Sequence, residues 1–113
     1  GFKGFEEAKS VLRKAMPVAR RALGLSHQTT LRLSLNYAEA LYKNGAATLD
    51  HLREAVTMLE ETAQTARRVF GGAYPITADI ELHLQEARAA LRARGDVEST
   101  RETVEAMTPP RDA

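Results

Sequence analysis

Apolar residues recur every three or four positions along most of the chain, which is the spacing of one face of an α-helix. The first such set covers residues 5–23, and Gly24 follows it as a helix stop. Pro17 lies inside this set and removes one backbone hydrogen bond. We therefore expect a helix over 5–23 with a kink, or a break into two pieces, at Pro17.

The same spacing predicts three further helices, each bounded by residues that start or stop helices. The second covers residues 30–43, after a short polar connector. The third follows Thr48, an expected N-cap, and ends at Phe70. The fourth covers residues 76–94, and Gly95 is expected to end it. The positions expected to be buried in these three helices are Leu31, Leu35, Ala38, Leu41, Leu52, Ala55, Val56, Leu59, Ala63, Ala66, Val69, Phe70, Ile80, Leu84, Ala87 and Leu91.

The chain is expected to divide into a helical domain, 1–95, and a C-terminal segment, 96–113. In that segment Asp96 or Ser99 is a suitable cap for a short helix ending by Met107, which offers little apolar surface. A proline-rich tail follows and ends any helix.

Composition agrees with an all-α fold, because aromatic residues make up only 5% of the chain and Ala and Leu occupy most apolar positions. Cysteine is absent, which excludes disulfides, thiol nucleophiles and thiolate metal sites. The formal net charge is only +1, so overall charge gives no reason to expect a nucleic acid or a membrane as partner. No apolar run reaches the roughly 18 residues of a membrane-spanning helix.

An offset of 47 residues aligns the chain with itself, without gaps, from Phe5 to Leu41. Eleven of the 37 aligned pairs are identical, which supports duplication of a helix, turn, helix unit, as in stacked helical repeats. The identical pairs are Glu7 and Glu54, Ala8 and Ala55, Leu12 and Leu59, Ala19 and Ala66, Arg20 and Arg67, Arg21 and Arg68, Gly24 and Gly71, Thr30 and Thr77, Leu35 and Leu82, Glu39 and Glu86, and Ala40 and Ala87.

Residues 20–31 (RRALGLSHQTTL) and 35–42 (LNYAEALY) resemble the linker and the first-helix core of the tetratricopeptide repeat (TPR) family, in its kinesin light chain-type variant. Residues 67–77 (RRVFGGAYPIT) are similar to the same linker, with Tyr74 at the place of His27. The resemblance covers about residues 4–94. It implies a right-handed α-α superhelix of four to five antiparallel helices.

In that frame the chain would hold the second helix of one repeat, one full repeat and the first helix of a further one. Two departures accompany the resemblance. Residues 44–50 form a longer turn than the family usually has, so the local angle between helices is open. Residues 82–87 (LHLQEA) keep the spacing of the first-helix core but lack its Asn, so this copy is degenerate and suits a terminal cap.

Solenoids of this family bind extended peptides on a concave surface lined chiefly by first helices. The resemblance therefore implies a groove on the helix over residues 30–43, where polar side chains are spaced by four, three and four residues. Asn36 matches the family position whose amide both donates to and accepts from a peptide backbone. The groove candidates are Arg32, Asn36, Glu39 and Lys43, with Asp79, His83 and Glu86 on the later helix. The same line also fits an ordinary solvated helix surface.

Stacked repeats stabilise one another, and about three are normally needed. This chain has fewer, so we expect uncovered apolar surface on its first helix. A second hypothesis follows, in which the protein is a structural subunit of a larger assembly and docks through that surface. Because the chain starts without Met, at Gly1, a fragment or processed form of a longer adaptor is a third possibility.

Other chemistry is weakly supported. Asp79, His83 and Glu86 share a helix face, but no second histidine cluster accompanies them, so no metal or cofactor is expected. Serines lack a nucleophile context and no phosphate-binding loop occurs, so we expect no enzyme activity. The Arg pairs stand at predicted helix ends and are balanced by glutamates, so no nucleic-acid partner is expected. Tyr37 and Tyr42 are expected to pack with their hydroxyls in water.

The expected compartment is intracellular, most simply the cytoplasm, because cysteine and any signal segment are lacking. The interior of an organelle, after removal of a transit peptide, is the alternative. A protein or peptide partner is expected in either place.

Overall fold

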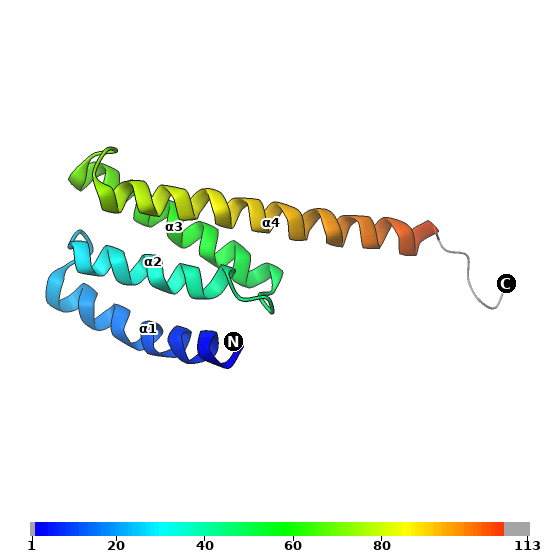
Figure 1. Ribbon diagram of the computed structural model, residues 1–113, viewed down its shortest axis with the longest axis horizontal. Coiled ribbons are helices and arrows are strands. Elements are labelled where there is room, and N and C mark those ends of the chain that lie inside the picture. The colour runs from blue at the N-terminus through cyan, green and yellow to red at the C-terminus, as the bar shows by residue number, and fades with distance from the viewer. Residues whose placement is uncertain (1, 108–113) are drawn as a thin grey trace.

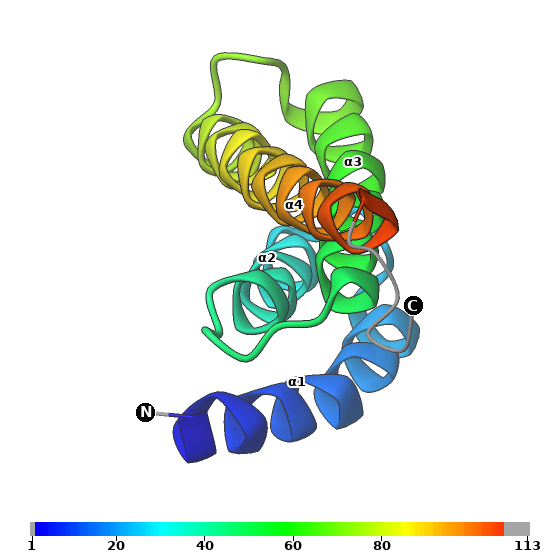
Figure 2. The ribbon, with the colours of Figure 1, turned by 90° about the vertical axis from the view of Figure 1, so that its right-hand side faces the viewer.

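The computed structural model of the 113-residue chain describes residues 2–107, and within them it shows four α-helices and no strand. α1 and α3 run in one direction, and α2 and α4 run in the other (Figure 1). α1 lies at the bottom of the array, α2 above it and α4 at the top (Figure 1), and α3 lies beside α2 and α4 (Figure 2). The predicted all-α fold is confirmed for this part of the chain. The helices are α1 (Phe2–Leu23), α2 (Gln28–Tyr42), α3 (Leu49–Phe70) and α4 (Pro75–Met107).

The 47-residue duplication is visible in the backbone. α3 begins and ends 47 residues after α1, and α4 begins 47 residues after α2. Both inter-copy loops turn on a glycine with positive φ, 91° at Gly24 and 87° at Gly71. In each loop the glycine N–H donates to the carbonyl oxygen four residues earlier, at 3.0 Å. Only glycine adopts this φ without strain, so the two loops are built by the same device.

The helices that follow these loops begin differently. His27 is the N-cap of α2, and its Nδ1 accepts from the Thr29 N–H at 3.0 Å. At the equivalent position Tyr74 precedes Pro75, which has no N–H to satisfy in the first turn of α4. The predicted cap Thr48 is confirmed at α3, where its Oγ1 accepts from the His51 N–H at 3.1 Å.

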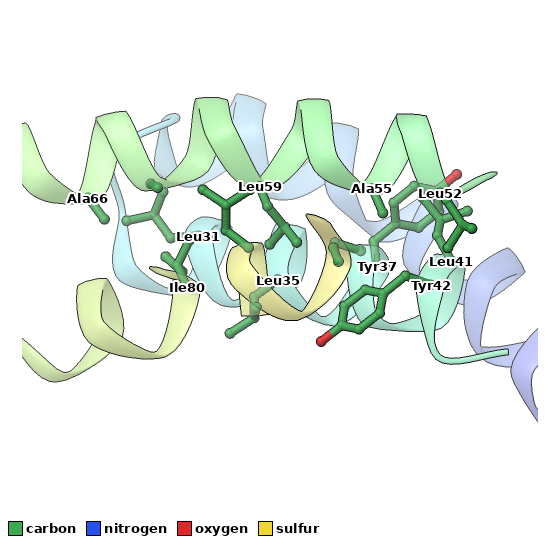
Figure 3. Packing of buried hydrophobic residues seen from close by; sticks show 14 of the residues in the cluster. Leu31, Leu35, Tyr37, Leu41, Tyr42, Leu52, Ala55, Leu59, Ala66 and Ile80 are labelled. Carbon is green, nitrogen blue, oxygen red and sulfur yellow. The ribbon is translucent and has the colours of Figure 1, made fainter. Parts of the chain in front are cut away.

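One hydrophobic core joins α2, α3 and α4, with Met16 of α1 at its edge. Figure 3 shows Leu59 and Ala66 of α3 directed toward α2 and α4, whereas the ring of Tyr42 on α2 points away from α3. Burying each large side chain of this kind contributes about 1.5–3 kcal/mol. Most of the predicted core is confirmed, although Val69 is exposed. The largest fully buried side chains are Leu35, Leu41, Leu59, Ile76, Ile80 and Thr77.

Of the two alternatives expected at Pro17, a kink or a break, the break is wrong, because α1 is a single helix with Pro17 inside it. Pro17 and the next residue, Val18, are exposed, whereas Met16 and Ala19 are buried. The missing backbone bond therefore lies on the solvent side, where water can satisfy the free carbonyl, while the buried side keeps the helix together. α1 is curved in Figure 2.

The predicted helix end at Gly95 is also wrong, since α4 continues to Met107. Unlike Gly24 and Gly71, Gly95 has no positive φ, so it does not form a helix stop. A glycine inside a helix costs about 1 kcal/mol relative to alanine, which the surrounding helix formers outweigh. Residues 99–107 are exposed, so this end of α4 stands clear of the core. The proline-rich tail lies outside the described residues.

Candidate functional site

The candidate groove residues line the neighbouring helices α2 and α4. The duplication places equivalent positions of the two copies beside each other, because α2 and α4 run in the same direction (Figure 1). We call this set the polar face, and it consists of Arg32, Asn36, Glu39 and Lys43 on α2 with Asp79, His83 and Glu86 on α4.

An ion pair closes one end of the polar face. Arg32 Nη1 lies 3.4 Å from Asp79 Oδ2, and the two residues are 47 positions apart. Both side chains are about half exposed, at 45% and 52%. A pair this open to water contributes between 0 and about 1 kcal/mol to stability, so a charged ligand group can replace either partner at low cost.

A denser cluster forms the other end, around the Tyr42 hydroxyl. That hydroxyl donates to Glu86 Oε2 at 2.8 Å and lies 2.6 Å from His83 Nδ1. On the far side of the imidazole ring, His83 Nε2 lies 3.3 Å from Glu39 Oε1. Lys43 Nζ contacts Glu39 Oε2 at 3.4 Å and completes the cluster.

Hydrogen-bond geometry sets the protons in this cluster. The single Tyr42 proton is given to Glu86, so the Tyr42 oxygen accepts from Nδ1–H of His83. Nε2 of His83 faces a carboxylate, and it donates there when it also carries a proton. An imidazole with both protons therefore satisfies every contact of the ring and bridges α2 to α4.

Tyr42 is the buried centre of the cluster, with 8% of its surface exposed. Burial raises the pKa of the Tyr42 hydroxyl well above its ordinary range, and the hydrogen bond and negative charge of Glu86 act in the same direction. The hydroxyl is therefore a neutral donor at physiological pH. It holds Glu86 against α2 and supports the ring of His83.

Asn36 occupies the middle of the polar face, between the ion pair and the cluster. It is one turn of α2 from Arg32 and less than one turn from Glu39, and it is exposed. Within residues 2–107, no hydrogen bond engages its side-chain amide. That amide therefore keeps a donor and an acceptor for a ligand.

The structure thus brings five of the seven polar-face residues into contacts between α2 and α4, while Lys43 contacts Glu39 within the same helix and Asn36 is left open. The expectation that the hydroxyls of Tyr37 and Tyr42 lie in water is wrong. Tyr37 packs in the core, and its hydroxyl accepts from Arg13 and donates to Glu54, each at 3.3 Å. The sequence did contain a sign that Tyr42 belongs to this site. Tyr42 follows Glu39 by three residues, which places both side chains on one side of α2.

Several arginines considered for nucleic-acid contacts are paired with carboxylates. Both carboxylate oxygens of Glu81 accept from Arg67, at 2.5 and 2.6 Å. Arg88 of α4 contacts Glu60 of α3 at 3.0 Å. These pairs link α3 to α4 and reduce the free positive charge on that side.

A second candidate surface is the outer side of α1. Val11 and Val18, seven residues apart, are 66% and 56% exposed. Ala8 and Ala22 continue the same line and are exposed as well. The expected uncovered apolar surface on the first helix is therefore confirmed.

Residues 2–107 contain no group of three or more His, Asp or Glu side chains arranged to hold a metal ion. None of the four helices, over the same residues, has the length and apolar character needed to cross a bilayer. Comparisons with protein-family models, with curated proteins and with solved structures give no match. Function is therefore inferred from the geometry and chemistry of this all-α chain itself.

Proposed function

We propose that this chain is a non-catalytic protein-interaction module of the TPR kind, which holds an extended peptide segment against the polar face of α2 and α4. Two features support a stacked-repeat module. The helix bounds recur after 47 residues, and the loops at Gly24 and Gly71 share one hydrogen-bond pattern. The proposal carries with it the right-handed superhelix, an intracellular setting and the absence of a cofactor.

The observation that carries the proposal is the state of Asn36. Its amide is open, whereas the charged groups on either side of it are held in α2–α4 contacts. Those contacts keep the long side chains beside Asn36 ordered before a ligand arrives, which lowers the entropy cost of binding. An amide both accepts from a peptide N–H and donates to a peptide carbonyl, so Asn36 would read the backbone of an extended segment rather than its sequence.

The test is a selection from a displayed library of random peptides, followed by titration calorimetry with one selected peptide. Asn36→Ala is expected to weaken binding about tenfold, because the peptide backbone groups lose their partner on desolvation. Arg32→Ala is expected to weaken binding of peptides that carry an acidic residue. Circular dichroism checks that each variant keeps the helicity of the parent.

Gln64→Ala is the matched control, since Gln64 is also an exposed amide but lies on α3. It should leave the affinity unchanged. Equal affinities for the parent, Asn36→Ala and the Asn36→Ala, Arg32→Ala double variant would show that the polar face does not bind the peptide, and the proposal would fail.

A second candidate function is a structural subunit of a larger assembly that docks through the uncovered side of α1. The exposed valines Val11 and Val18 favour it, because water-exposed apolar lines of this kind typically mark contact surfaces. In this case Asn36 would be dispensable, whereas an acidic residue at Val11 or Val18 would abolish assembly.

A further inference from the structure

The exposed side of α1 can be compared with the equivalent side of α3 in the second copy of the duplicated unit. We define the α1 face as Ala8, Val11, Ala15, Val18 and Ala22, spaced by three and four residues. The first four positions correspond, 47 residues later, to Ala55, Met58, Thr62 and Thr65 of α3. Val11 and Val18 are more than half exposed, whereas none of these four α3 residues is exposed.

At two positions α1 and α3 carry the same residue, so their exposure can be compared directly. Ala8 is exposed, while its equivalent Ala55 is fully buried. Leu12 is half-buried, while its equivalent Leu59 is fully buried. α3 is packed by the helix before it and the helix after it, whereas α1, within residues 2–107, is packed by α2 alone. The α1 face is therefore a packing surface that no described helix covers.

α4, on the opposite side of the array, also carries exposed residues whose equivalents in the other copy are buried. We define the α4 face as Ala78, Leu82, Gln85 and Ala89, all exposed, with Leu82 at 53%. Their equivalents in α2 all lie in the core that α2 shares with α3 and α4. The α4 face is therefore also a packing surface that no helix within residues 2–107 covers. The α2 equivalents and their exposed fractions are Leu31 at 3%, Leu35 at 1%, Ala38 at 0% and Tyr42 at 8%.

The two ends also differ in charge. Residues 8–22, which span the α1 face, include five basic residues and no acidic one, a net charge of +5. Residues 78–89, which span the α4 face, include three acidic residues and one basic residue, a net charge of −2. α1 and α4 lie on opposite sides of the array (Figure 1), so the basic α1 face and the acidic α4 face point away from each other. Head-to-tail contact between copies pairs opposite charges, whereas contact between two α1 edges or two α4 edges pairs like charges.

We propose that this chain associates with itself head to tail, with the α4 face of one copy packed against the α1 face of the next. The internal packing of α2 on α3 is the template for this contact. Such an interface is heterologous, so each added copy leaves one free α1 face and one free α4 face. The proposal names the partner for the second candidate function and does not depend on peptide binding by the polar face.

The test uses the full chain and two sets of substitutions at exposed positions, where folding should be unaffected. The first variant, Val11→Asp with Val18→Asp, spoils the α1 face, and the second, Leu82→Asp, spoils the α4 face. Ser10→Asp is the control for adding one negative charge, since Ser10 is exposed on α1 but lies outside the α1 face. Sedimentation velocity over a wide range of protein concentration gives the molar mass, and circular dichroism gives the helicity.

The parent chain and Ser10→Asp are expected to gain mass with concentration. Each face variant alone is expected to self-associate at least tenfold more weakly, because burying a charged group opposes the contact. An equal mixture of the two face variants should form a dimer that grows no further. Such a dimer arises because the intact α4 face of the first variant meets the intact α1 face of the second.

Dimer formation in the mixture, but not by either variant alone, distinguishes head-to-tail contact from symmetric contact. A parent chain that stays monomeric throughout would overturn the proposal, as would a Leu82→Asp variant that still dimerises through α1 alone. Self-association that survives both sets of substitutions would overturn it too. Peptide titration with Asn36→Ala reports on the polar face independently, so failure of one proposal is distinguishable from failure of the other.

Discussion

Arg32 and Asp79 occupy the same register position in the two copies of the duplicated unit, and they form an ion pair at 3.4 Å between Nη1 and Oδ2. The duplication thus brings a position next to its own counterpart, with opposite charge in the two copies. Because both side chains are half exposed, water screens the pair. The pair therefore adds little to the stability of the fold. For a ligand, it provides two charged side chains that are already held in place, one on α2 and one on α4.

A double-mutant cycle with Arg32→Ala and Asp79→Ala checks this directly. Urea unfolding should give a coupling free energy below about 1 kcal/mol, and added salt should reduce it. A coupling of several kcal/mol would show instead that the pair is a structural lock between α2 and α4. A ligand could then not open it without weakening the fold.

Much of the fold could be predicted from periodicity because α2, α3 and the first half of α4 bury one face against a shared core. The role of Thr48 as the N-cap of α3 could be predicted from its side-chain hydroxyl and its position just before the helix. The helix end expected at Gly95 was wrong, and of the kink or break expected at Pro17 the break was wrong; at both positions a residue that disfavours helix competes with its surroundings. Burial of Met16 and Ala19 carries α1 past the proline, and the lack of a left-handed turn lets α4 pass the glycine.

The candidate site was predictable as a line of residues but not as a set of contacts. Helical spacing places Asn36 and Glu39 on one side of α2, and the 47-residue offset pairs Arg32 with Asp79. The position of Tyr42 between His83 and Glu86 depends on how far apart α2 and α4 pack, which no sequence spacing specifies. From the sequence alone, a tyrosine hydroxyl at the end of a helix is expected to be exposed, because the sequence does not show that a second helix covers it.

Tyr42→Phe should destabilise the fold by about 1–2 kcal/mol at neutral pH, because Glu86 and His83 lose a buried partner. The raised pKa of Tyr42 makes this difference depend on pH. In the unfolded chain the hydroxyl ionises near its ordinary value of 10.0, whereas in the folded protein it keeps its proton to higher pH. The folded state then binds more protons, so stability falls as the pH rises above 10.

Urea unfolding of the parent and of Tyr42→Phe, from neutral to alkaline pH, measures this effect. The gap between their free energies of unfolding should stay constant below pH 10 and shrink above it. A gap that is the same on both sides of pH 10 would mean that the Tyr42 hydroxyl ionises equally in the folded and unfolded chain.

Two glycines should respond to alanine in opposite directions. Gly71→Ala places a Cβ on a backbone with φ 87°, and should cost about 1–3 kcal/mol. Gly95→Ala fills an open position inside α4, where no atom lies within 4 Å of the added Cβ, and should add stability of up to about 1 kcal/mol. Thermal unfolding followed by circular dichroism measures both, and a loss of helicity in Gly95→Ala would argue that α4 ends at residue 95.

Thr77 offers the last contrast between the two copies. Its Oγ1 is fully buried and has no hydrogen-bond partner among residues 2–107, whereas Oγ1 of the equivalent Thr30 donates to the Ala19 carbonyl oxygen at 3.5 Å. A buried hydroxyl without a partner opposes folding, and valine has the same branched shape without the polar atom. Thr77→Val should therefore stabilise the protein by about 1 kcal/mol, while Thr30→Val should be neutral or slightly destabilising. Chemical denaturation of both variants decides the point, and a destabilised Thr77→Val would show that the hydroxyl is bonded in solution, by water or by a shift of the α3–α4 loop.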